Sequence, residues 1–69
     1  MRQRNINFSF EELDPVHLFF RLDVSRSEFA EMMGTSIDTI DSWCQHRRRP
    51  STTARRLAAE IAEKLNISY

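Results

Sequence analysis

One glycine and two prolines are the only residues in this 69-residue chain that strongly interrupt a helix. A sequence with so few helix breakers is predicted to fold as an all-α protein. Its hydrophobic fraction of 41% is ordinary for a globular domain and too high for a disordered chain. A chain of this length forms one small domain and buries only about 60% of the surface that its unfolded form exposes. We therefore expect a single all-α domain of modest stability.

The sequence also indicates the compartment in which the protein works. Cys44 is the only cysteine, which excludes an internal disulfide and fits a reducing environment. The longest apolar run, residues 16–20, is interrupted by His17 and is too short to span a membrane. Residues 1–13 contain acidic side chains and lack the apolar segment of a signal peptide. We expect a cytoplasmic protein without a membrane partner.

Capping residues divide most of the chain into four helices. Four polar residues occupy positions typical of a helix N-cap: Asp14, Ser25, Ser36 and Ser51. Pro15 strengthens the first start, and Glu28 completes a capping box at the second. Gly34 and Asn66 are suited to end the second and fourth helices, because both residue types tolerate a left-handed conformation. The third helix is predicted to cover about residues 36–46.

Residues 1–13 are expected to form an extended arm, because apolar and polar residues alternate there at a period of two. The first helix, predicted to run to about residue 22, has a wide apolar arc. Leu18 and Leu22 lie on the flank opposite its other apolar side chains. Two occupants remain open for this flank: the arm, through Ile6, Phe8 and Phe10, or a second copy of the chain. An exposed apolar surface of this kind also suits another protein.

The formal net charge is zero, but the charges are unevenly distributed. Residues 1–43 carry four basic and eight acidic side chains, whereas residues 44–69 carry six basic and two acidic ones. Five of the arginines lie within residues 47–56. A polyanion is therefore expected to be attracted to one pole of the molecule.

Residues 26–43 hold the most informative pattern. Ala30 supplies a small side chain where two short helices cross closely, and Gly34 supplies the positive φ that a tight turn between them requires. Ile40 and Trp43 face inward from the following helix. We expect both of these large side chains to lie in the hydrophobic core.

The stretch from residue 24 to residue 65 resembles the helix-turn-helix domains of phage-repressor type, the Cro and XRE-like family. It contains VSRSEFAEMMGTSIDTIDSW and, after the third helix, the basic stretch HRRRPS. The only glycine lies where the motif requires one. The resemblance implies a four- to five-helix lambda-repressor-like domain over residues 14–69, with its turn at residues 34–36. It also implies a small double-stranded DNA-binding protein, a transcription regulator, whose third helix enters the major groove.

The same resemblance assigns residues to a DNA interface. Candidates for base contact lie at the start and on the outward face of the third helix: Ser36, Ile37, Asp38, Asp41, Ser42 and Gln45. Candidates for phosphate contact are basic: Arg26, Arg47, Arg48 and Arg49. Gln45 can pair with an adenine edge, and Ile37 can contact a thymine methyl group. The outward face carries two aspartates and no basic residue, and His46 stands where relatives often have glycine.

A function of another class would keep this fold and bind a protein. Such an adaptor or antitoxin-like module would use the acidic face of the third helix, or the arm and first helix, as its docking surface. The sequence shows no arrangement typical of catalysis. Cys44, His46 and His17 lack the paired spacing of metal ligands. We therefore expect neither an enzyme nor a cofactor.

Overall fold

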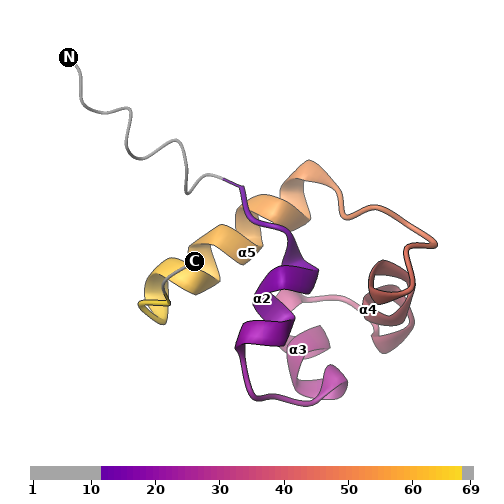
Figure 1. Cartoon of the computed structure of the whole chain (residues 1–69), viewed down its shortest axis with the longest axis horizontal. Helices are drawn as coiled ribbons and strands as arrows, with labels where there is room; N and C mark the ends of the chain where they lie inside the picture. Colours follow the sequence, from indigo (N-terminus) through magenta and orange to yellow (C-terminus); the bar gives the residue numbers. More distant parts are fainter. Residues whose placement is uncertain (1–11, 68–69) are drawn as a thin grey trace.

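The computed structural model describes residues 12–67, and within that range the chain forms four helices and no strand. The helices are α2 (Pro15–Arg21), α3 (Arg26–Met33), α4 (Ile37–Cys44) and α5 (Thr52–Lys64) (Figure 1). The expectation of an all-α fold is confirmed for this part of the chain. The arm residues Ile6, Phe8 and Phe10, with the interactions predicted for them, lie outside the described residues.

Each of the four helices begins at the capping residue that the sequence predicts. The Asp14 carboxylate accepts a hydrogen bond from the Val16 amide at 3.0 Å. At the start of α3 the capping box is complete, because the Ser25 hydroxyl accepts from the Glu28 amide and the Glu28 carboxylate accepts from the Ser25 amide, both at 3.0 Å. The other two caps use serine hydroxyls: Ser36 at α4 and Ser51 at α5. These bonds satisfy amides that have no partner inside a helix.

Three helices end in the same chain reversal, in which one residue adopts a left-handed conformation. These residues are Gly34 after α3, His46 after α4 and Asn66 after α5, with φ values of 67°, 61° and 57°. In each case the next residue donates its amide to a carbonyl five positions earlier, at distances of 2.8–2.9 Å. This pattern is the Schellman motif, which satisfies carbonyls that would otherwise remain unpaired. The expected roles of Gly34 and Asn66 as helix ends are confirmed.

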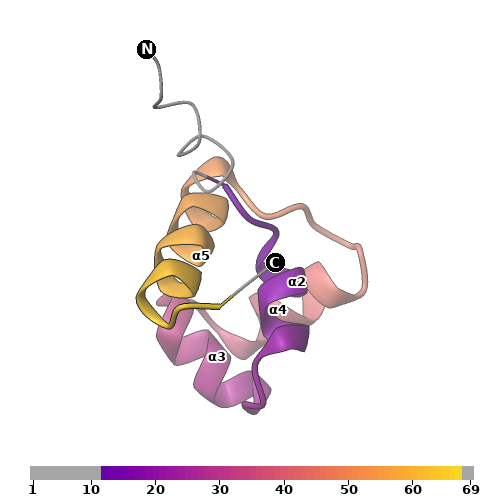
Figure 2. The same ribbon diagram turned by 60° about the vertical axis from the view of Figure 1, so that its left-hand side comes forward.

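The hydrophobic core receives side chains from all four helices. Its buried members are Leu18, Phe29, Ala30, Met33, Ile40, Trp43, Ala58 and Ala62. Helix α2 packs on α4 and α5, and α3 packs on α4 and α5, so the four helices surround one core (Figures 1 and 2). The expected core positions of Ile40 and Trp43 are confirmed.

Leu18 is a correction to the sequence analysis, which placed it on a partner surface. It is 1% exposed and belongs to the core. Because α2 packs on both α4 and α5, its two flanks are covered by the domain itself. Leu22, predicted for the same surface, is half-buried against the core and is the C-cap of α2. The apolar side chain that α2 leaves to solvent is Phe20, which is 73% exposed.

Two predicted helix boundaries also differ from the structure. Helix α2 ends at Arg21, and α4 ends at Cys44, earlier than the expected residue 46. The reversal at His46 stops α4 because its left-handed backbone cannot continue a right-handed helix. Leu65 is the C-cap of α5 and is half exposed.

The segment that precedes α2 is held on α5. The Leu13 amide donates to the Arg55 carbonyl at 3.0 Å, and the Leu13 side chain packs against the core. The Arg55 guanidinium bonds to the Glu12 carboxylate at 2.9 Å and to the Pro50 carbonyl at 2.7 Å. Arg55 therefore joins the start of the described chain, the α4–α5 connection and α5.

The left-handed residues predict opposite effects of two substitutions on stability. A Cβ atom added at Gly34 meets no atom within 4 Å, so Gly34→Ala changes backbone strain without a steric clash. We expect the free energy of unfolding to fall by about 1 kcal/mol. His46→Gly relieves the backbone strain at the second reversal, so it should raise the free energy of unfolding by up to about 1 kcal/mol.

Urea denaturation followed by far-ultraviolet circular dichroism measures both changes. His46→Ala is the matched control, because it removes the same side chain but keeps a Cβ atom. It should be no more stable than the natural protein. Equal stabilities of the Gly and Ala variants at residue 46 would contradict the assigned backbone strain.

Candidate nucleic-acid interface

Helices α3 and α4, with the turn between them, form the framework of the candidate site. Gly34 reverses the chain, and the Thr35 amide donates to the Ala30 carbonyl at 2.9 Å, which holds the turn against the end of α3. Ala30 is buried where the two helices pack. The turn predicted at residues 34–36 is thus the connection between α3 and α4, and it fixes how α4 is presented to solvent.

The first turn of α4 presents a mixed surface to solvent. Ser36 is exposed, and its hydroxyl caps the helix through the Thr39 amide at 3.2 Å. Ile37 is 46% exposed, although most large apolar side chains of the described residues are buried or half-buried. Asp38 is exposed and forms no salt bridge or side-chain hydrogen bond with another described residue. Gln45, at the opposite end of α4, is also exposed.

Asp41 and Arg26 form a salt bridge between the two helices. The Arg26 Nε atom lies 2.9 Å from the Asp41 Oδ1 atom, and the two side chains are 56% and 34% exposed. The pair joins the first residue of α3 to the middle of α4. It also neutralises one of the two aspartates that the sequence placed on the outward face, which leaves Asp38 as the carboxylate without a cation in the described part of α4.

Ser42 is the second correction to the predicted site. It was expected to face outward for base contact, but it is 5% exposed. The Schellman reversal at His46 returns the chain over it: the Arg47 amide donates to the Ser42 carbonyl at 2.8 Å, and Arg47 Nη2 donates to Ser42 Oγ at 3.4 Å. Ser42 therefore contacts Arg47 and is not available to a base.

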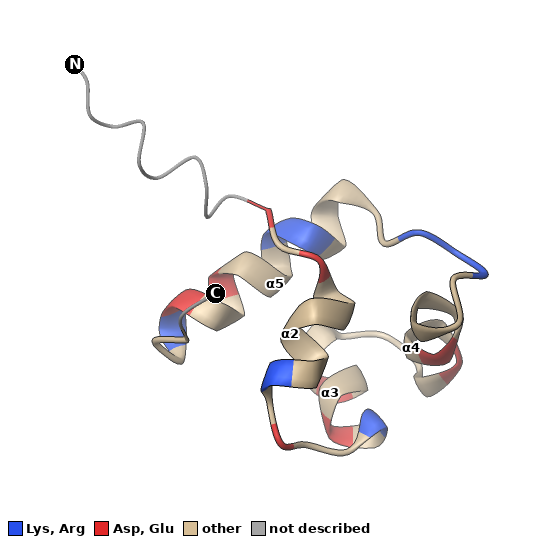
Figure 3. Ribbon diagram, viewed as in Figure 1, with Lys and Arg blue, Asp and Glu red and all other residues tan. Residues whose placement is uncertain are grey.

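Arg48 and Arg49 lie on the exposed connection between α4 and α5 (Figure 3). Within residues 12–67 neither forms a salt bridge, and the same is true of Arg47. Arg55, by contrast, is occupied by Glu12 and the Pro50 carbonyl. Three uncompensated cations are thus gathered directly after α4, at the pole that the sequence predicts to be basic.

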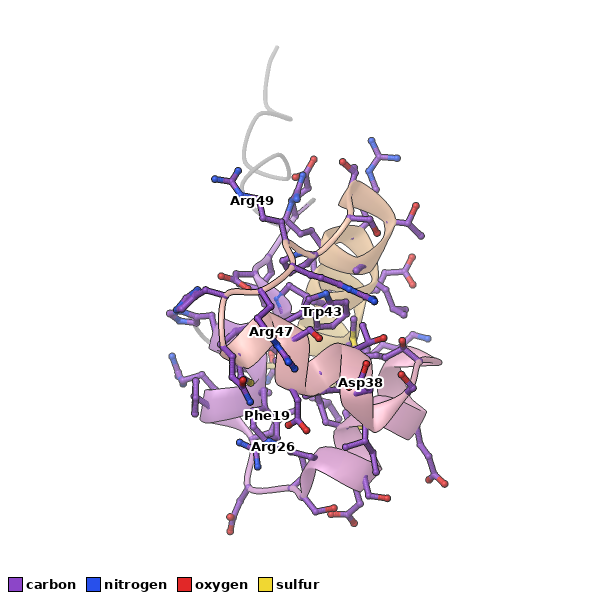
Figure 4. All side chains as sticks on the ribbon, turned by 90° about the vertical axis from the view of Figure 1, so that its right-hand side faces the viewer. Phe19, Arg26, Asp38, Trp43, Arg47 and Arg49 are labelled. Carbon is purple, nitrogen blue, oxygen red and sulfur yellow. The ribbon has the colours of Figure 1, made fainter. Side chains whose placement is uncertain are left out.

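The position of Arg47 was missed by the sequence analysis, which found no basic residue on the outward face of α4. Figure 4 shows the Arg47 side chain lying across the ribbon of α4, whereas Arg49 lies beyond the end of that helix. The signal in the sequence was His46. A left-handed residue there returns the next residue to the helix that it has just left, so Arg47 belongs to the surface of α4.

A hollow of about 470 Å³ lies between the α4–α5 connection and the start of α2. Its lining includes Asp14, Trp43, His46, Arg48 and Arg49. Trp43 itself is almost entirely buried, whereas the lining residues Val16 and Pro50 are half-buried. The hollow opens at the basic pole, beside Arg48 and Arg49.

Residues 12–67 contain no group of three His, Cys, Asp or Glu side chains placed to hold a metal ion. None of the helices α2 to α5 has both the length and the apolar composition needed to cross a membrane. Comparisons of the chain with family models, with curated proteins and with solved structures found no match.

The Arg26–Asp41 pair is expected to fix the orientation of the Arg26 side chain and to contribute little to the stability of the fold. Both side chains are at least one-third exposed, and ion pairs of this kind contribute about 0.2–1 kcal/mol. A double-mutant cycle with Arg26→Ala and Asp41→Ala, measured by urea denaturation, should give a coupling energy within that range. The control is a second cycle that combines Arg26→Ala with Glu60→Ala. Glu60 lies on α5 and forms no salt bridge with Arg26, so its coupling energy should be close to zero. A coupling energy above about 2 kcal/mol would contradict this assignment.

Proposed function

We propose that this protein binds double-stranded DNA through α4 and the arginines that follow it, as a helix-turn-helix regulator of transcription. The observation that carries the proposal is the combination of a solvent-exposed short helix with three uncompensated arginines at its C-terminal end. The resemblance of residues 24–65 to phage-repressor domains supports the same reading. Such a regulator works in the cytoplasm, and a dimer of it would read two half-sites about one helical turn apart.

The dimensions of α4 suit the major groove. An α-helix with its side chains is about 10–12 Å in diameter, and the major groove of B-DNA is about 12 Å wide. The packing of α3 behind α4 leaves Ile37, Asp38 and Gln45 exposed, and these side chains can reach base edges. Arg48 and Arg49 then lie beside the groove, where phosphates run.

The distribution of charge supports binding at one pole. A protein with no net charge gains little from a polyanion unless its cations are gathered on one side. The Arg26–Asp41 pair reduces the repulsion between α4 and phosphates, because it removes one uncompensated carboxylate from this side. Arg26 keeps further N–H donors and remains able to contact a phosphate.

Fluorescence anisotropy on labelled random-sequence duplex DNA, titrated at several salt concentrations, tests the proposal. We expect measurable affinity at about 50 mM salt and a log–log salt slope that corresponds to three to five phosphates. The double variant Arg48→Ala, Arg49→Ala should lower the slope by about 2 and weaken binding roughly tenfold for each arginine at low salt.

Lys64→Ala is the matched control. It removes one cation, where the double variant removes two, and that cation lies at the end of α5, far from the α4–α5 connection, so the affinity for DNA should be almost unchanged (Figure 3). Absence of binding by the natural protein at about 50 mM salt would contradict the proposed function. An equal loss of affinity in both variants would contradict the assigned position of the interface.

The exposed Phe20 favours a second candidate, a protein-binding adaptor or antitoxin-like module. A large aromatic side chain that is 73% exposed on α2 is suited to a protein interface. The variant Phe20→Ser distinguishes the two candidate functions. A DNA-binding protein should retain its affinity for duplex DNA in this variant, because α2 is not part of the proposed interface. An adaptor would lose its protein partner.

A further inference from the structure

We infer that Arg47 reads a guanine base and that Ser42 positions it for this contact. The inference rests on the proposed function and assigns Arg47 a role different from that of the neighbouring Arg48 and Arg49. In this reading, Arg47 and Ser42 determine sequence preference, whereas the other two arginines contribute affinity for any duplex.

The first support is the placement of the Arg47 side chain. Its amide is bonded to the Ser42 carbonyl at 2.8 Å and its Nη2 atom to Ser42 Oγ at 3.4 Å, so backbone and side chain both return to α4. The Arg47 side chain therefore lies against the helix that is proposed to enter the groove, although Arg47 itself follows that helix in the chain (Figure 4). A side chain in that position would face the edges of the bases and not the sugar–phosphate backbone.

The second support is the donor inventory of the guanidinium. Arginine has five N–H donors, and one of those of Arg47 is used by the Ser42 hydroxyl. Its partner is neutral, and no described carboxylate is bonded to it, so the positive charge is uncompensated within residues 12–67. The remaining donors still form a two-pronged edge. That edge matches the O6 and N7 acceptors of guanine, the commonest specific contact in the major groove.

The third support is the negative charge on the same helix. Asp38 has no cation partner among the described residues and lies on α4, the helix against which the Arg47 side chain lies (Figure 4). A carboxylate repels phosphate, which disfavours a backbone phosphate at this surface, but it can accept a hydrogen bond from a cytosine amino group. An arginine donor and an aspartate acceptor on one helix face are together suited to G·C base pairs.

Selection of bound sequences from a random duplex library tests the inference. We expect the natural protein to enrich a guanine at one position of the bound site. Arg47→Ala should reduce the preference for that guanine by roughly tenfold or more and leave the salt slope almost unchanged. Arg48→Ala, the matched control, should keep the sequence preference and lower the salt slope by about 0.9.

Ser42→Ala tests the positioning role. It replaces a small buried side chain by one of similar size and removes the acceptor for Arg47, so the folded domain should persist. We expect a weaker guanine preference with unchanged affinity for random duplex DNA, which a purely structural role for Ser42 would not produce. Retention of the full preference in this variant would contradict the positioning role.

The outcomes also separate this inference from the proposed function. If the protein binds duplex DNA without any guanine preference, or if Arg47→Ala weakens all sequences equally and lowers the salt slope by about 0.9, Arg47 is a phosphate contact and the inference is wrong. In that case the proposed function stands. If no duplex DNA is bound at all, the proposed function fails first.

Discussion

The left-handed reversal at helix ends is the constraint on which this structure depends. Helices of seven or eight residues contain few internal hydrogen bonds, so a large share of their backbone groups must be satisfied at the ends. Hydroxyl and carboxylate caps satisfy the amides, and Schellman reversals satisfy the carbonyls. At Gly34 the reversal places α4 against α3. At His46 it returns Arg47 to the surface of α4.

This constraint links the fold directly to the distribution of charge. The acidic and basic parts of the sequence are separate, but the Arg26–Asp41 bridge and the return of Arg47 alter how they meet on α4. One aspartate is neutralised by the preceding helix, and one arginine is brought onto a face that had none in the sequence. The surface of α4 therefore carries both a hydrogen-bond acceptor and a cation. The proposed recognition of DNA bases by α4 rests on this combination.

Local features of this domain were predictable from the sequence, and burial by neighbouring elements was not. Each cap joins two residues that are two or three positions apart, so sequence spacing alone identifies it. The capping residues are Asp14, Ser25, Ser36 and Ser51. Helical periodicity placed Ile40 and Trp43 correctly because the core side of α4 is its most apolar side. These predictions needed no knowledge of the other helices.

Periodicity failed where a second element covers a face. Leu18 lies on the minor apolar flank of α2, and only the packing of α2 between two helices buries it. Ser42 lies opposite Ile40 on α4 and is nevertheless buried, and the chain that returns after His46 bonds to its carbonyl and hydroxyl oxygens. The sequence therefore predicted the helix and the run of arginines after it, but it did not predict the contact between Arg47 and Ser42 that joins them.

The central claim is that α4 and the connection after it form the surface that meets DNA. Amide chemical shifts of isotopically labelled protein, recorded while a short duplex DNA is added, test it most directly. We expect shift changes concentrated at Arg26 and residues 36–49, with little change around Phe20 and the end of α5. Changes centred on Phe20, or no change at a salt concentration of about 50 mM, would contradict it.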